Sequence, residues 1–227
     1  MTAERSAAAR VSLRWPLISA GAAFALVAIL ALVIVYRESN KPFGFEVEWM
    51  SQVVAHRSAF WTVPAMVFNF LGGGITATII APGLIIIGLL VWRRPWAAVY
   101  FAAAEVASVI LVQVLKNLIG RPRPTDIIVN ADFGSFPSGH SANAALIAAT
   151  LGIVFLRVWV WVAGAVYTVG MMLSRTYLGA HWISDTIGGM LVGAGVAIIV
   201  WAPLALVLRD EQARSHPPLW QRQRLLH

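Results

Sequence analysis

Arg175, His181 and Asp185 stand close together in a chain that is otherwise rich in apolar side chains. His181 and Asp185 are four residues apart, so on a helix they would share one face. A carboxylate beside an imidazole can hold one ring nitrogen protonated and leave the other free to act as a nucleophile. Arg175 carries a planar, permanently charged guanidinium that suits phosphate oxygens. This stretch predicts a nucleophile, its orienting acid and an anion-binding cation; a polar helix end at a membrane surface is the alternative.

Two further stretches carry residues suited to binding an anion. Lys116 and Arg123 lie at the end of an expected span, and residues 137–140 (Pro-Ser-Gly-His) lie where a helix is expected to begin. The free N–H groups and the dipole at a helix start attract anions. Gly139 lets the backbone approach closely, and the Ser138 hydroxyl can donate a hydrogen bond. The sequence contains no carboxylate cluster with the spacing of metal ligands, which favours a mechanism without a metal.

The composition identifies an integral membrane protein. Of the 227 residues, 59% are hydrophobic and only 12% are charged, whereas about a quarter are charged in a soluble domain. A span needs about 20 apolar residues, so about six spans fit. The first apolar run, residues 15–36, is too long for a signal-peptide core and is expected to be an uncleaved anchor. The absence of cysteine excludes disulfides and thiolate metal sites.

The predicted fold is all-α and polytopic, with six transmembrane helices. The spans are expected at about residues 15–36, 75–92, 95–118, 137–156, 158–173 and 181–208. The domain prediction is a cytoplasmic N-terminus over 1–14, a six-helix membrane domain over 15–208, and a polar cytoplasmic tail over 209–227.

An interfacial helical segment is expected between the first and second spans. Residues 37–57 mix apolar and charged side chains, as helices lying in the membrane interface do. A second interfacial or re-entrant helix is expected at residues 59–71. The glycine run 72–74 is followed by no Lys-Ser/Thr pair, so it is interpreted as a break between helices rather than a phosphate loop. Residues 119–136, rich in glycine and proline, are predicted to be a loop.

The distribution of basic residues predicts the orientation. With six spans both termini lie on one side, and ten of the 17 lysines and arginines fall there, so the termini are expected to be cytoplasmic. The three polar stretches then meet at the opposite, extracytoplasmic face. We therefore expect a multi-pass plasma-membrane protein with its active site outside.

Two polar or small-residue features are left outside the predicted site. Glu105 precedes Lys116 by eleven residues, about 16 Å along a helix, so it is expected near the middle of the bilayer. It is a candidate for function, or for a structural hydrogen bond to Asn143, Ser141 or Ser108. The pattern Gly189-x-x-x-Gly193 predicts close helix packing.

The three stretches resemble a family signature. Lys116-x6-Arg123-Pro124, Pro137-Ser138-Gly139-His140 and Ser174-Arg175-x5-His181-x3-Asp185 look like the three motifs of the type-2 phosphatidic acid phosphatase superfamily. That superfamily includes bacterial undecaprenyl pyrophosphate phosphatases and phosphatidylglycerophosphate phosphatases. Arg121-Pro122 forms a second Arg-Pro pair, but the family spacing selects Arg123.

The resemblance implies a metal-independent lipid phosphate phosphatase without a cofactor. By this resemblance His181 attacks phosphorus and forms a phosphohistidine, Asp185 orients it, and His140 serves as general acid and then as base. The phosphate-binding residues implied by it are Lys116, Arg123, Ser138, Gly139 and Arg175, with Ser174 supporting Arg175.

The expected partners are the membrane lipids and a lipid phosphate that enters laterally from the bilayer, and no nucleic acid. An isoprenoid or a phospholipid would fit, with undecaprenyl diphosphate preferred. A phosphotransferase would use the same residues, whereas a lipid-phosphate flippase or carrier would tolerate loss of His140, His181 and Asp185. The sequence leaves open the lipid, a mono- or diphosphate, and the oligomeric state.

Overall fold

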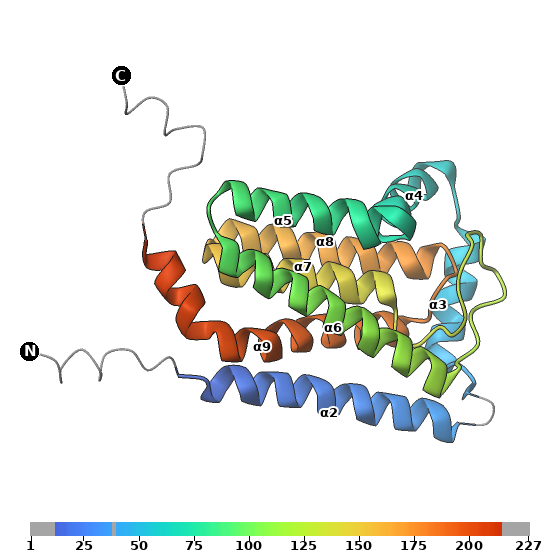
Figure 1. The fold of residues 1–227 in the computed structure, drawn as a ribbon. Helices are drawn as coiled ribbons and strands as arrows, with labels where there is room; N and C mark the ends of the chain where they lie inside the picture. Colours follow the sequence, from blue (N-terminus) through green and yellow to red (C-terminus); the bar gives the residue numbers. More distant parts are fainter. Residues whose placement is uncertain (1–11, 38–39, 215–227) are drawn as a thin grey trace, which may run out of the picture.

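The computed structural model describes residues 12–37 and 40–214, and within these ranges every regular element is a helix. The elements are α2 (Arg14–Tyr36), α3 (Gly44–Ala55), α4 (Ala59–Gly72), the π-helical segment η2 (Thr76–Ile80), α5 (Ala81–Val91), α6 (Pro95–Ile119), α7 (Gly139–Phe155), α8 (Val158–Tyr177) and α9 (Ile183–Ala213) (Figure 1). The predicted all-α class is confirmed.

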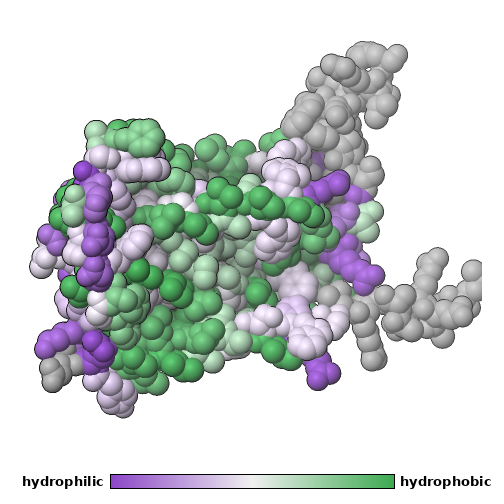
Figure 2. All heavy atoms as spheres, turned by 180° about the vertical axis from the view of Figure 1, so that it is seen from behind, coloured by the Kyte–Doolittle hydropathy of each residue, from purple (hydrophilic) through white to green (hydrophobic). Residues whose placement is uncertain are grey.

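The helices have the lengths and composition of membrane spans. In the described part of the chain four helices are long and apolar enough to cross a bilayer: α2, α6, α8 and α9. The pair formed by α4 and η2–α5 is bent by 50° and passes as a fifth, broken span, while α7 is apolar but only 17 residues long. Figure 2 shows apolar side chains gathered between two hydrophilic ends. The chain is therefore a multi-pass membrane protein.

Helix α2 illustrates how such a surface arises. It is uncharged from Trp15 to Tyr36, and of its residues only Ala20, Val27 and Ile34 are buried against the rest of the protein. These three residues recur every seventh position, so they form the narrow stripe of a helix that contacts a neighbour along one line. Helix α2 runs beside α9 (Figure 1). Its other apolar side chains face outward, as they do in a lipid-exposed helix.

Helix α7 is packed closely between α6, α8 and α9. A Cβ atom on Gly193 would lie 2.0 Å from the Ala142 carbonyl oxygen, and one on Gly189 would lie 2.3 Å from that of Ser138. These two glycines of α9 are therefore required for the backbone of α7 to approach, and the predicted close packing is confirmed.

One end of the bundle gathers the segments that carry the three motifs. Helix α6 ends at Gly120 in the left-handed conformation (φ 57°), an irregular connector follows, and α7 begins after Ser138, whose hydroxyl accepts a hydrogen bond from the Ser141 N–H. The C-terminus of α8, the N-terminus of α9 and helix α3 lie at the same end (Figure 1). The predicted loop over 119–136 thus corresponds to this connector.

The opposite end holds the start of α2 and the end of α9 (Figure 1). Helix α9 continues to Ala213, five residues beyond the predicted end of the membrane domain at 208. Glu211 in this extension accepts hydrogen bonds from the N–H groups of Trp96 and Ala97 at 2.9 and 3.1 Å. A carboxylate satisfies the free donors at the start of α6 here.

Candidate active site

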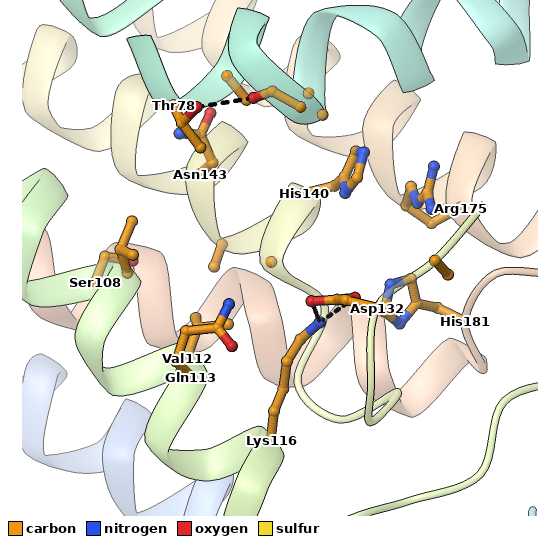
Figure 3. A pocket seen from close by; sticks show the side chains of 18 of the residues that line it. Thr78, Ser108, Val112, Gln113, Lys116, Asp132, His140, Asn143, Arg175 and His181 are labelled. Atoms are coloured by element: carbon orange, nitrogen blue, oxygen red, sulfur yellow. Dashed lines mark hydrogen bonds and ion pairs between the residues drawn. The ribbon is translucent and has the colours of Figure 1, made fainter. Parts of the chain in front are cut away.

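A pocket of about 370 Å³ opens at the end of the bundle where the three motifs meet (Figure 3). Six of the nine predicted site residues line it: Lys116, Arg123, Gly139, His140, Arg175 and His181. Three segments distant in the sequence thus supply one cavity, and both histidines face it.

His181 lies in the turn between α8 and α9 and is buried. Its Nδ1 atom is 2.7 Å from the carbonyl oxygen of Ser135, whereas the nearest carboxylate oxygen of Asp185 is 3.7 Å away. A carbonyl oxygen can only accept, so Nδ1 carries the proton and Nε2 is the free nitrogen. The sequence predicted that Asp185 orients His181. In the structure the Ser135 carbonyl, and not the Asp185 carboxylate, makes the shorter contact with Nδ1.

The electrostatic surroundings keep His181 neutral. Burial lowers the pKa of its imidazole well below the usual value, and the positive charges of Arg123, Arg175 and Lys116 lower it further. Arg123 Nη1 donates to His181 Nε2 at 3.2 Å. A neutral imidazole whose basic nitrogen faces a guanidinium is prepared to attack an electrophile that binds beside that guanidinium.

Lys116 and Arg123 share one carboxylate, that of Asp132. Lys116 Nζ donates to both Asp132 oxygens at 2.8 Å, and Arg123 Nη2 donates to Asp132 Oδ1 at 2.7 Å. Burial raises the pKa of Asp132, but the hydrogen bond from Lys116 and the charges of both cations outweigh it, so the pKa is lowered overall. Asp132 was not identified from the sequence, because an aspartate in a polar loop carries no signal of its own.

Arg175 reaches the pocket from the last turn of α8 and is almost fully buried. Its Nη1 donates to the Asn69 side-chain oxygen, and its Nε has no hydrogen-bond partner among the described residues. A guanidinium anchored on one side, with donor capacity left on the other, is suited to receive an anion.

His140 occupies the first turn of α7, and its Nε2 is buried without a hydrogen-bond partner among residues 12–37 and 40–214. The glycine run makes room for this ring, since a Cβ atom on Gly73 would lie 2.8 Å from His140 Nε2, and one on Gly72 would lie 2.9 Å from Cδ2. The run does separate α4 from η2, as predicted, and it also allows α4 to approach His140.

Three predicted site residues do not line the pocket. Ser138 is fully buried, and its hydroxyl oxygen accepts from the Ser141 N–H and hydroxyl. Ser174 donates to the Ala65 carbonyl at 2.8 Å, which fixes α8 against α4 near Arg175. Asp185 lies behind His181. These residues support the pocket wall, whereas the six others face the cavity.

Asp185 belongs to a buried ionic cluster. Arg121 Nη1 donates to Asp185 Oδ1 at 2.6 Å, and Arg121 Nη2 donates to Glu46 Oε2 at 2.7 Å, with all three side chains inaccessible to solvent. Glu46 also accepts from the N–H and the hydroxyl of Ser184 at 2.9 and 2.5 Å. Arg121, from the second Arg-Pro pair of the sequence, thus lies in this buried cluster and not in the pocket. Through Glu46 the cluster connects helix α3 to the start of α9.

Glu105 lines the inner part of the pocket, within the membrane-spanning helix α6. Its Oε1 accepts a hydrogen bond from Asn143 Nδ2 at 2.8 Å, which is one of the three structural partners expected from the sequence.

Comparison with known proteins identifies relatives with the same motif region. The PAP2 superfamily model matches residues 97–205. Phosphatidylglycerophosphatase B of Bacillus subtilis is 30% identical over 129 residues, which cover 52% of this chain and 64% of the relative. The lipid A 1-phosphatase of Rhizobium etli is 32% identical over 128 residues, covering 50% and 54%, and the undecaprenyl-diphosphatase of Sulfolobus acidocaldarius is 36% identical over 78 residues, 34% of each chain. The alignments thus span less than two thirds of these curated relatives.

Two solved structures share the fold. A transmembrane PAP2 type phosphatidylglycerolphosphate phosphatase from Bacillus subtilis superposes with a TM-score of 0.71 at 24% identity, covering 88% of this chain and 99% of that one. Aquifex aeolicus LpxE superposes with a TM-score of 0.61 at 25% identity, covering 70% and 95%. Residues 97–205, which contain the three motifs, match the PAP2 superfamily model, as these motifs predicted.

Proposed function

We propose that this protein is a membrane-embedded lipid phosphatase that hydrolyses a phosphomonoester or diphosphate of an isoprenoid or phospholipid. The observation that carries this proposal is the convergence of two histidines and three cations, of which Lys116 and Arg175 are buried, on one pocket. His181 presents a neutral, unprotonated Nε2 there, beside the guanidinium of Arg123.

In the first step His181 Nε2 attacks phosphorus, and the bond from phosphorus to the lipid oxygen breaks. Protonated His140 donates its proton to the departing oxygen, so the lipid leaves as a neutral alcohol or as the shorter phosphate. The Nδ1 proton stays on the ring and remains hydrogen-bonded to the Ser135 carbonyl, and the Asp185 carboxylate 3.7 Å from Nδ1 stabilises the positive phosphohistidine.

In the second step a water molecule attacks the phosphohistidine. Neutral His140 accepts a proton from the water, the bond between phosphorus and Nε2 breaks, and inorganic phosphate leaves with His181 neutral again. Lys116, Arg123 and Arg175 bind the equatorial oxygens as charge spreads over them, together with the Gly139 N–H. No metal or cofactor takes part in this proposal.

The membrane arrangement supports a lipid substrate. Helix α7 has 17 residues and is about 26 Å long, which is close to the thickness of a bilayer core, about 30 Å. We therefore propose that α7 makes a sixth crossing. We also propose that α3 lies in the membrane interface. The sequence assigns ten lysines and arginines to the side of the termini and seven to the other side, which supports a plasma-membrane protein with cytoplasmic termini. The pocket then opens at the extracytoplasmic face, where a lipid could enter from the side.

The class of lipid is narrowed by the relatives, which act on phosphatidylglycerophosphate, lipid A phosphate and undecaprenyl diphosphate. Their common chemistry is a phosphate on a membrane-anchored alcohol. Among these we favour an undecaprenyl-type diphosphate as the first substrate to be tested.

The test is phosphate release from purified protein in detergent, with EDTA present and a panel of lipid mono- and diphosphates. We expect release by the wild type, and none by His181→Ala that elutes and melts like the wild type. Ser19→Ala, a substitution of a hydroxyl that bonds only within α2, is the matched control. Metal-dependent release, or binding of lipid phosphates without release, would contradict the proposal; the latter would favour a carrier. Transfer to an added alcohol would identify a phosphotransferase.

A further inference from the structure

The Asp132 carboxylate occupies the centre of the cationic part of the pocket. Figure 3 shows its side chain pointing inward between Lys116 and His181, with both oxygens on the Lys116 ammonium. The same carboxylate accepts from Arg123 Nη2 at 2.7 Å. Two of the three cations proposed to bind phosphate are therefore already bound to an anion that belongs to the protein.

Arg123 has no donor to spare for a phosphate in this arrangement. Its Nη1 donates to the Ala180 carbonyl and to His181 Nε2. Its Nε donates to the Asp132 carbonyl, and its Nη2 donates to the Gly134 carbonyl and to the Asp132 carboxylate. A phosphate that binds to Arg123 must replace one of these acceptors. The three carbonyl oxygens are parts of the backbone, and the His181 ring is held in place by the contact of its Nδ1 with the Ser135 carbonyl. The Asp132 side chain is therefore the acceptor that can leave without moving the chain or the nucleophile.

Because Asp132 lies at the surface, its side chain can leave the two cations at a small cost in free energy. Its side chain is 57% exposed, and residues 130–133 around it are exposed as well, so the carboxylate can turn into solvent. Lys116, by contrast, is buried, with 4% of its side chain accessible. A buried ammonium without a counter-ion is unfavourable, and Asp132 supplies that counter-ion while no phosphate is bound.

We propose, on the basis of the proposed function, that the Asp132 carboxylate is an internal competitor of the substrate phosphate. It binds Lys116 and Arg123 when phosphate is absent and is displaced when the phosphate dianion of a lipid or of the product binds. Two anions on one pair of cations would repel each other, so the two states exclude one another. Asp132 therefore lowers the affinity for phosphate and speeds release of the product.

The experiment compares Asp132→Asn and Asp132→Ala with the wild type in binding of inorganic phosphate, by calorimetry on the purified full chain in detergent. We expect about three- to tenfold tighter binding in both variants, because a half-exposed ion pair contributes little more than an exposed one. Asp126→Asn is the matched control, since Asp126 lies in the same connector, is exposed, and its side chain accepts from Thr125. The control should bind phosphate like the wild type.

The direction of the change decides the outcome. If Asp132 instead holds Lys116 and Arg123 in place, its loss weakens phosphate binding, and weaker or unchanged binding in both variants overturns the proposal. Absence of phosphate binding in every variant overturns it too. A parallel assay with lipid substrate should show a lower KM and stronger inhibition by phosphate in Asp132→Asn.

Binding of inorganic phosphate needs no turnover, so the two proposals can fail separately. Tighter phosphate binding by the Asp132 variants, without release of phosphate from any lipid, would contradict the proposed phosphatase function. It would still support the proposed role of Asp132. Lipid hydrolysis with no gain in phosphate binding would contradict the competitor alone.

Discussion

The Nδ1 atom of His181 lies 2.7 Å from the carbonyl oxygen of Ser135. This contact joins the turn before α9 to the connector before α7, and it fixes which ring nitrogen is protonated. A backbone carbonyl can hold the tautomer but carries no net charge. The Asp185 carboxylate, 3.7 Å from the same nitrogen, is placed to stabilise the positive charge that develops on the ring. The two supports of the imidazole thus have separate tasks.

This division predicts a moderate effect of Asp185→Asn. Because the Ser135 carbonyl still fixes the tautomer, kcat should fall by about 10- to 100-fold, the usual loss for an indirect support of an imidazole. That is well below the about 10⁴-fold loss seen where a carboxylate alone holds the tautomer. Steady-state phosphate release at saturating lipid measures it, and a loss near 10⁴-fold would assign the tautomer to Asp185.

The buried cluster predicts a stability effect of Arg121→Met. The substitution leaves the Glu46 and Asp185 carboxylates without their shared cation, and breaking a buried pair costs about 3–5 kcal/mol. The melting temperature in detergent should fall strongly. Arg37→Met is the control, because Arg37 is exposed and, among the described residues, its guanidinium donates to the carbonyls of Lys41 and Pro42 and lies over the Phe43 ring. Equal melting of the two variants would show that the cluster contributes nothing to stability.

The glycine run predicts a loss of activity in Gly73→Ala. The new Cβ would lie 2.8 Å from His140 Nε2 and 2.9 Å from the Asn69 carbonyl oxygen, so the ring must move away from its position. A displacement of about 1 Å can cost about 10²-fold in rate, and we expect kcat to fall by that order. Gly83→Ala, where the Cβ meets no atom within 4 Å, is the matched control. Unchanged turnover in Gly73→Ala would remove His140 from the proton transfer.

The neutral state of His181 predicts how stability depends on pH. Its pKa is lowered by burial and then by the neighbouring cations, so the folded protein binds a proton on this ring less readily than the unfolded chain, in which a histidine has a pKa of about 6.5. The unfolded state therefore gains protons as the pH falls, and stability is lost below about 6.5.

Thermal melting at pH 7 and pH 5 tests this coupling. The wild type should lose more stability between these values than His181→Asn, which keeps an N–H donor for Ser135 but cannot titrate. Parallel curves for the two proteins would mean that folding does not lower the pKa of His181, which would contradict the neutral nucleophile.

The sequence by itself determined the helical class, the approximate bounds of the helices and the three motifs. Long apolar runs can only be satisfied as helices in a bilayer, because each backbone group must find its partner within the run. Proline, glycine and charge clusters marked the ends of these runs. The spacing of Lys116, Arg123, His140, Arg175 and His181 carried the chemical information, and the structure brings all five to one pocket.

Only the tertiary structure decided what supports and opposes these residues. Ser135 acts through its carbonyl oxygen, which every residue has, so no sequence pattern could identify it. Glu46 lies 75 residues from Arg121 and 139 from Asp185, and their pairing depends on where α3 docks. Asp132 reaches Lys116 because the connector turns back at Gly134 (φ 71°). Contacts between distant segments follow from the path of the chain in space, which local spacing does not encode.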